Sequence, residues 1–229
     1  NLYRKDTSPA HILTYQEFNR VNRNLMPNYY RCLLEDKLVF DRYLKSFGFP
    51  LAETIGMVRD NHMKWFSTGE EEPLDQLAGQ ELDCFLKMVT QWGGEHVHRL
   101  VNHNGTLTID NQPAGIEMLK SMSRQGTFVL QKTIRQHPTM DQLNPSSVNS
   151  IRLVTMSDGM GVSNLAGFVR MGLKDSVIDN ITRGGVGCGI HEDGTLHREG
   201  LNGSMRIDRH PTSGLVFEGF SLPWYKEAQ

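Results

Sequence analysis

Two apolar runs in the second half of the chain strongly limit how it can fold. In residues 151–156 and 162–169 apolar side chains recur with a period of two, which is typical of β-strands. The polar sequence Ser157-Asp158-Gly159 separates the runs, so we predict an antiparallel hairpin. We expect the stretch from residue 131 to residue 189 to be organised around this hairpin.

Charged residues occur inside and just after the predicted strands. Arg152 and Arg170 lie within the two runs, and the polar groups Asp179-Asn180 and Arg183-Gly184-Gly185 follow. A strand that packs on a core gains nothing from an arginine unless an anion meets the guanidinium. The hypothesis is therefore that the hairpin and the following loop hold a phosphorylated intermediate.

Length and composition narrow the classes of protein to consider. The chain has 229 residues, enough for one large domain or two small lobes. Its formal net charge of −2 gives no bulk electrostatic reason to expect a nucleic-acid partner. No apolar run is long enough to cross a membrane, and the first residues lack the apolar core of a signal peptide. We expect a cytoplasmic protein, and the sequence leaves its oligomeric state open.

Cysteines and histidines offer weaker signals. The three cysteines form no Cys-x-x-Cys pair, which fits reduced thiols: Cys32, Cys84 and Cys188. Cys188 lies near the predicted loop and is either a nucleophile or, since no base stands beside it in sequence, a packing residue. A first group of histidines could bind zinc, but no further ligand lies at a useful spacing. The alternative is that they are histidines on surface strands: His96, His98 and His103. A second group lies in or beside turns and is expected to face solvent: His191, His197 and His210.

The first half of the chain alternates helical and strand patterns. Residues 1–35 are expected to be helical and irregular, with Pro27 ending a helix. A second helix is expected between an N-cap at Asp36 and a C-terminal glycine at Gly48. Strands are expected at 54–58, 64–66, 84–89 and 128–131, an acidic loop at 67–73, a hairpin turn at Asn104-Gly105 and a helix at 113–122.

Two lysines in this half stand at unusual places. Lys87 lies on an apolar strand, where a buried ammonium needs an anionic partner. Lys37 lies in the first turn of a helix, where a positive charge does not help the helix, and a solvated surface lysine is the alternative. The Gly93-Gly94 loop could close main-chain N–H groups over phosphates, or it could simply turn the chain.

Cationic side chains and main-chain donors together suit phosphoryl chemistry, in which catalysis consists mostly of positioning and charge neutralisation. Arginine side chains also bind carboxylates in a two-pronged manner. A site with both properties would suit activation of a carboxylate by ATP and attack by an amine. The alternative is five unrelated surface charges, and the residues concerned are Lys37, Lys87, Arg152, Arg170 and Arg183, with Asn180 and Gly184-Gly185.

Several motifs resemble the ATP-grasp superfamily, and most closely its sugar-transfer-associated branch. The resemblance covers roughly residues 36–224, and the block from residue 131 to residue 152 is its most specific part. The motifs are Asp36-Lys37 before Gly48-Phe49-Pro50, Phe85-Leu86-Lys87 before Gly93-Gly94, Gln131-Lys132-Thr133-Ile134-Arg135-Gln136-His137-Pro138, Leu143-Asn144-Pro145-Ser146-Ser147-Val148-Asn149-Ser150-Ile151-Arg152, and Asp179-Asn180 before Gly184-Gly185.

The resemblance implies an α+β protein with an ATP-grasp fold, in which a nucleotide is held between two α+β lobes. It implies a helical N-terminal segment at 1–35, a small lobe with its lead-in at 36–128 and a large lobe at 129–229. Lys37 and Lys87 match the two lysines that reach phosphates, and the strand ending at Gln131-Lys132 matches the hinge whose backbone reads adenine.

The implied reaction has two steps. A carboxylate attacks the γ-phosphate to give an acyl phosphate, and an amine then displaces phosphate to leave an amide. Arg152, Arg170, Asn180 and Arg183 match residues that face the γ-phosphate and the acyl phosphate, with Gly184-Gly185 beside the substrate. The implied partners are a small carboxylate and a small amine, with a polysaccharide or amino-acid precursor suggested by the branch. Rival interpretations are a phosphotransferase acting on a hydroxyl and a nucleotide-binding module without activity.

The implied cofactors are ATP and Mg²⁺. In the family a later segment supplies an acidic residue and a Glu-x-Asn pair that hold the metal, and this sequence ends near Trp224 before such a segment. We expect either a shortened large lobe or a lost metal site, so the resemblance predicts magnesium without placing it on residues of this chain.

Overall fold

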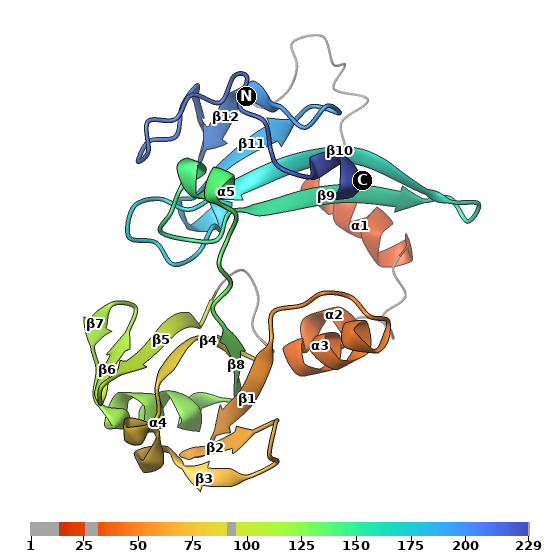
Figure 1. Ribbon diagram of the computed structural model, residues 1–229. Coiled ribbons are helices and arrows are strands. Elements are labelled where there is room, and N and C mark those ends of the chain that lie inside the picture. Colours follow the sequence, from red (N-terminus) through yellow and green to blue (C-terminus); the bar gives the residue numbers. More distant parts are fainter. Residues whose placement is uncertain (1–13, 26–31, 91–94, 229) are drawn as a thin grey trace. The chain divides into compact units, whose positions relative to one another are not determined.

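The computed structural model describes residues 14–25, 32–90 and 95–228 (Figure 1). The chain divides into two compact units, residues 1–133 and residues 134–229. Each unit contains one antiparallel sheet together with helices, so the fold is mixed α+β. The strand at the end of the first unit, β8, pairs with β1 and β4 of that unit.

An eight-stranded sheet forms the first unit, in the order β3-β2-β1-β8-β4-β5-β6-β7. Two-residue turns with positive φ at both residues connect neighbouring strands, as at Asp60-Asn61 and the predicted Asn104-Gly105. The strands are β1 (Thr54–Arg59), β2 (His62–Trp65), β3 (Glu71–Pro73), β4 (Leu82–Met88), β5 (Val97–His103), β6 (Thr106–Ile109), β7 (Gln112–Pro113) and β8 (Phe128–Lys132).

Two predictions for this sheet were wrong. Pro113 was expected to open a helix, but it lies in β7 and pairs with Thr108 of β6. The acidic stretch 67–73 was expected to be a loop, but its last residues form the edge strand β3, which pairs with β2. Glu71 and Pro73 are exposed there. Charge and proline are tolerated at a sheet edge because that edge faces water and no neighbouring strand needs the missing N–H.

Helix α4 (Ile116–Gln125) covers one face of the sheet (Figure 1). Its buried Leu119 joins a core with Leu86, Leu100, Phe128 and Leu130, none of which is more than 2% exposed. Side chains alternate across a strand, so the residues between these core positions point to the opposite face. That opposite face carries the polar side chains on which the candidate site depends.

Two of the helices before the sheet begin with side-chain caps. Helix α1 (Tyr15–Leu25) starts with a reciprocal pair in which Thr14 N–H donates to Glu17 and Glu17 N–H donates to Thr14. Helix α2 (Cys32–Glu35) is short, and α3 (Lys37–Ser46) has Asp36 as the predicted N-cap. Gly48, at φ 77°, follows the end of α3 as the sequence predicted.

A five-stranded sheet forms the second unit, in the order β13-β12-β11-β10-β9. Its core lies on the face that carries Val169, Met171 and Val186, and Phe217 from the chain after β13 belongs to the same core; all four are fully buried. Short helical elements lie around it: α5 (Pro138–Leu143), η4 (Ile181–Arg183) and α6 (Tyr225–Ala228). The strands are β9 (Ser150–Ser157), β10 (Val162–Met171), β11 (Val186–Ile190), β12 (Leu196–Asn202) and β13 (Met205–Ile207).

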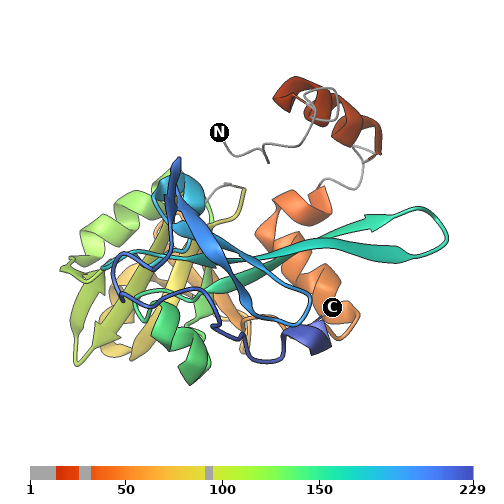
Figure 2. The ribbon, with the colours of Figure 1, turned by 90° about the horizontal axis from the view of Figure 1, so that it is seen from above.

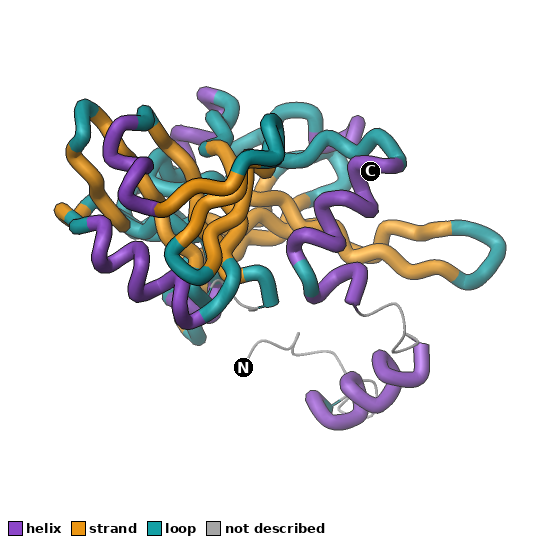
Figure 3. The backbone as a smooth tube through the Cα atoms, turned by 90° about the horizontal axis from the view of Figure 1, so that it is seen from below, coloured by secondary structure: helices purple, strands orange, loops and turns teal. Residues whose placement is uncertain are grey.

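The hairpin predicted from the two apolar runs is formed by β9 and β10. Its turn is closed by Asp158 Oδ1, which accepts the N–H groups of Met160 (2.8 Å) and Gly161 (3.0 Å). Strand β11 pairs with β10 only at residues 167–171, so the outer half of the hairpin extends beyond the other strands of its sheet (Figures 2 and 3). Val154 and Met156 are exposed there, and only the inner half of the period-two pattern is buried.

Candidate functional site

Lys87 lies on β4, on the face of the first sheet that points away from α4 and the core. Its ammonium donates to Gln131 Oε1 of β8 over 2.7 Å, and it lies 5.8 Å from the centre of the Phe85 ring. The side chain is half-buried. The sequence predicted an anionic partner for this ammonium, and the hydrogen bond described here is to the neutral side-chain amide oxygen of Gln131.

Lys37 ties the start of α3 to the end of β4. Its main-chain N–H donates to the carbonyl of Val89 over 3.1 Å, and its ammonium donates to the carbonyl of Met88 over 2.7 Å. Burial lowers the pKa of the Lys37 ammonium below its usual value, and the negative charge of Asp36 opposes this change. Lys37 is therefore not a freely solvated surface lysine.

The other predicted nucleotide contacts are on or near the same strands. Strand β8 pairs with a strand on each side, so its main-chain groups are used in the sheet. At residue 131 the strand therefore presents the side chain of Gln131 on the sheet face. Lys132 is exposed, and its ammonium lies 2.6 Å from Glu53 Oε2. Gly93 and Gly94 lie outside the described residues.

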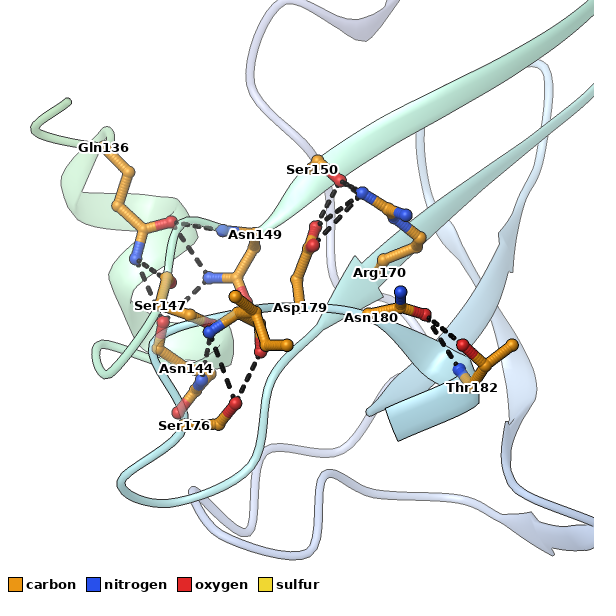
Figure 4. Close-up of polar contacts among 11 residues, drawn as sticks. Gln136, Asn144, Ser147, Asn149, Ser150, Arg170, Ser176, Asp179, Asn180 and Thr182 are labelled. Carbon is orange, nitrogen blue, oxygen red and sulfur yellow. Dashed lines mark hydrogen bonds and ion pairs between the residues drawn. The ribbon is translucent and has the colours of Figure 1, made fainter. Parts of the chain in front are cut away.

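In the second unit, Arg170 is held by a compact polar cluster (Figure 4). Its Nη2 lies 3.1 and 3.2 Å from the two carboxylate oxygens of Asp179. Ser150, its cross-strand partner on β9, accepts from Arg170 Nε at 3.1 Å and from Nη2 at 2.9 Å, and donates its hydroxyl to Asp179. The side chains of Arg170 and Asp179 are only 20% and 14% exposed.

Arg152 lies on the same face of the hairpin, two residues after Ser150 on β9. Partial burial lowers the pKa of the Arg152 guanidinium, the positive charge of Arg170 lowers it further, and Asp179 acts in the opposite direction. In the described part of the chain no hydrogen bond or ion pair of Arg152 is found. Two guanidiniums therefore lie near a single carboxylate, and one positive charge is in excess.

Residues 180–185 form a tight turn after this cluster. The Asn180 side chain accepts from the N–H and hydroxyl of Thr182, and the Asn180 carbonyl accepts the N–H groups of Arg183 and Gly185. Gly184 has φ 92°, where a side chain is strained. A Cβ at Gly185 would lie 2.8 Å from the Asn180 carbonyl oxygen. The shape of the turn therefore explains why both positions are glycine. Arg183 is exposed at the end of η4.

Side-chain amides fix the chain that leads into β9. Gln136 Nε2 donates to the carbonyls of Asn144 and Ser147, and its Oε1 accepts from the main chain and side chain of Asn149. Asn149 also donates to the carbonyls of Met140 and Asn144. Asn144 and Asn149 are almost completely buried. This network lies within the sequence block that carried the resemblance, and it fixes the position of Ser150 at the start of β9.

Cys188 is a packing residue. It is 1% exposed in the core of the second unit, and burial raises the pKa of its thiol to about 12. The thiol donates to the carbonyl of His197 over 3.3 Å. A thiol with so high a pKa carries almost no nucleophilic thiolate near neutral pH.

Two of the histidines considered for a zinc site pair with nearby carboxylates. His98 pairs with Asp110 and His103 with Glu81, and among the described residues no group of three or more metal-binding side chains is found. His210 was expected to face solvent, and that prediction was wrong. Its ring is fully buried, donates Nε2–H to the Gly172 carbonyl over 2.8 Å and accepts two main-chain N–H groups at Nδ1. The residues of the turn fold over the ring and bury it, so a position beside a turn was not enough to predict that His210 would be exposed.

Ser150 and Asp179, which hold Arg170, lie within motifs that the sequence analysis named. Two polar residues beside Gln131 in the first unit, Thr54 and Asp41, were not singled out from the sequence. Their common signal is a polar residue at a position where the pattern expects a buried one. Asp41 is 6% exposed and Thr54 is 7% exposed. Such positions gain a hydrogen-bond partner when they are buried, which sequence periodicity alone does not reveal.

These features define a mixed α+β protein whose two antiparallel sheets each present cations held by polar side chains, as suits the handling of anionic ligands. The chain matches the family model described as sugar-transfer associated ATP-grasp over residues 18–229, and it belongs to that family. Comparison with the curated proteins and with the solved structures found no match.

Membership of the family gives the general class of activity. ATP-grasp proteins are generally ATP-dependent ligases that use ATP and Mg²⁺. No helix in the described residues is both long and apolar enough to cross a membrane. The described side chains do not assemble a group of carboxylates that would fit a magnesium ion, so no step below is assigned to a metal.

Proposed function

We propose that this protein is an ATP-dependent carboxylate–amine ligase that forms an amide bond through an acyl phosphate. The observation that supports this proposal most is the excess positive charge shared by Arg152 and Arg170 beside Asp179. The Arg152 side chain is exposed, and a surface with an unneutralised guanidinium favours a bound anion. Guanidinium geometry suits both carboxylate and phosphate.

The proposed chemistry transfers one phosphoryl group and forms one amide. A carboxylate oxygen of the acid substrate bonds to the γ-phosphorus while the bond from that phosphorus to ADP breaks. The amine nitrogen then bonds to the acyl carbon, the carbon–oxygen bond to phosphate breaks, and the amine loses a proton. The products are an amide, ADP and phosphate, and no protein nucleophile is required.

Within this scheme each group of residues has a separate task. Lys87 neutralises charge on the ATP phosphates, with Lys37 fixing the start of α3 beside the end of β4. Arg152 and Arg170 stabilise the acyl phosphate, and Asn180 and Arg183 belong to the turn that follows them. The acid and amine are proposed to be small molecules, with a polysaccharide or amino-acid precursor among them. The family description, which refers to sugar transfer, supports the polysaccharide precursor.

Hydroxylamine trapping of the acyl phosphate tests the proposal. The full chain is incubated with ATP, Mg²⁺, hydroxylamine and a panel of sugar acids and amino acids, and hydroxamate and ADP are measured. Equal amounts of hydroxamate and ADP with at least one acid are expected. A phosphorylated hydroxyl product formed without any amine would overturn the proposal in favour of a phosphotransferase. ATP binding with no turnover of any acid would overturn it in favour of a binding module.

A matched pair of variants links the activity to the proposed residues. Arg152→Ala should lower hydroxamate formation by about a hundredfold, the usual effect of removing one group that stabilises transition-state charge. ATP affinity should be unchanged. The control is Arg206→Ala, which removes an exposed arginine of the same unit that is paired with Glu199. Equal activity in the two variants would exclude Arg152 from the reaction.

A further inference from the structure

A chain of hydrogen bonds crosses the first unit from α3 to Lys87. Asp41 of α3 accepts the Thr54 hydroxyl at Oδ1 over 2.8 Å. Thr54 Oγ1 lies 3.2 Å from Gln131 Nε2, and Gln131 Oε1 accepts from the Lys87 ammonium over 2.7 Å. The four side chains come from α3, β1, β8 and β4, so elements far apart in sequence meet in one line.

We call the side chains of Asp41, Thr54, Gln131 and Lys87 the relay. The direction of every hydrogen bond in the relay follows from the groups at its two ends, a carboxylate and an ammonium. The Asp41 carboxylate can only accept, and its other oxygen accepts from Lys45 over 2.9 Å. The Thr54 hydroxyl must therefore donate to Asp41, which leaves its oxygen free to accept from the Gln131 amide nitrogen. The Gln131 carbonyl oxygen must then face Lys87, which can only donate.

Burial makes the loss of any hydrogen bond in this relay costly. Asp41 and Thr54 are 6% and 7% exposed, so water cannot readily replace a lost partner. An amide flipped at Gln131 would place its NH₂ group against the ammonium of Lys87 and its oxygen against a hydroxyl that is already donating to Asp41. Both contacts would be lost at once, so one orientation of Gln131 is strongly favoured.

We propose that Asp41 and Thr54 are positioning residues that fix the Gln131 amide and, through it, the Lys87 ammonium for the phosphates of ATP. This inference rests on the proposed role of Lys87 in binding ATP. The relay restricts the ammonium to one direction before the nucleotide arrives, which lowers the entropy lost on binding. Asp41 and Thr54 contact no phosphate themselves and act only through Gln131.

The test uses Thr54→Val, which keeps the side-chain shape and removes the hydroxyl, and Thr54→Ser, which keeps the hydroxyl. Affinity of the full chain for a non-hydrolysable ATP analogue is measured by titration calorimetry. We expect Thr54→Val to weaken binding by about tenfold and Thr54→Ser by less than about twofold. The matched control Thr106→Val removes an exposed hydroxyl of β6 in the same sheet and should leave affinity unchanged.

A double-mutant cycle separates positioning from a general loss of structure. If Thr54 acts through Lys87, Thr54→Val should add nothing to the loss caused by Lys87→Ala. Full additivity of the two losses would overturn the relay, and so would wild-type affinity in Thr54→Val while Lys87→Ala binds weakly. Unchanged affinity in Lys87→Ala itself would instead remove the nucleotide role of Lys87 and the premise with it. Thermal unfolding of each variant confirms that the proteins compared are folded.

Discussion

Replacing Asp179 by asparagine should separate the structural role of the arginine cluster from its charge. The substitution keeps the shape of the side chain and removes the negative charge that faces Arg170 Nη2 at 3.1 and 3.2 Å. Hydrogen bonds to a charged group contribute about 1.5–3 kcal/mol each, and a mostly buried pair lies within this range. Because Arg170 remains 20% exposed and keeps Ser150 as a partner, we expect a loss of about 2 kcal/mol.

The loss is measured as the free energy of unfolding in urea and as a shift in Tm. For a unit of this size, about 2 kcal/mol corresponds to a fall in Tm of roughly 10 °C. The control is Asp208→Asn, which breaks an ion pair with Arg209 whose side chains are 60% and 59% exposed. That variant should lose less than about 0.5 kcal/mol, because exposed ion pairs contribute little.

Phosphate provides the second measurement on the same variants. With Asp179 neutral, Arg152 and Arg170 repel each other without a compensating carboxylate, so a bound anion should recover more stability than in the wild type. Tm is compared in phosphate and in chloride at equal ionic strength. A loss as small as that of Asp208→Asn, together with no preference for phosphate, would refute the assignment of this cluster as an anion site.

Three further predictions concern the second unit. Burial lowers the pKa of His210, so the unfolded chain binds more protons than the folded chain. The stability contributed by neutral His210 should be complete above about pH 6.5 and fall as the pH drops below that value. Urea unfolding across this range should show that the free energy of unfolding depends less steeply on pH in His210→Gln. Gly185→Ala would place a Cβ 2.8 and 2.9 Å from two main-chain oxygens and should cost about 2 kcal/mol in the same assay, whereas an unchanged midpoint would contradict this packing. Maleimide labelling of the native protein near neutral pH, read by mass spectrometry, should modify exposed Cys32 and spare buried Cys188, whose thiol has a pKa of about 12; rapid labelling of Cys188 would contradict its assignment as a packing residue.

Local sequence patterns were sufficient to predict several elements of the fold. The Ser157-Asp158-Gly159 turn and its period-two flanks predicted the β9–β10 hairpin, and Asp36 predicted the start of α3. Turn and cap residues act on their nearest neighbours in the chain, so their effect can be read without knowing the rest of the fold. The family was also identified from motifs, and the match over residues 18–229 confirms it.

Exposure was harder to predict because it depends on what packs over a segment. His210 lies beside a turn, yet the turn closes over its ring, while the outer half of an apolar hairpin remains exposed since β11 stops short of it. The edge strand β3 was missed for a related reason. Its acidic residues resemble a loop, and only the presence of β2 beside it provides the hydrogen-bond partners that make it a strand.

The sequence by itself determined which residues carry charge on strands that otherwise read as core, and so it identified Lys87, Arg152 and Arg170. The tertiary structure alone decided what holds Lys87 and Arg170. Gln131 contacts Lys87 and is itself held by Thr54 and Asp41, while Ser150 and Asp179 reach Arg170 from two segments. A buried charge imposes a need for partners but does not specify their place in the chain, because strand register and sheet order bring those partners together.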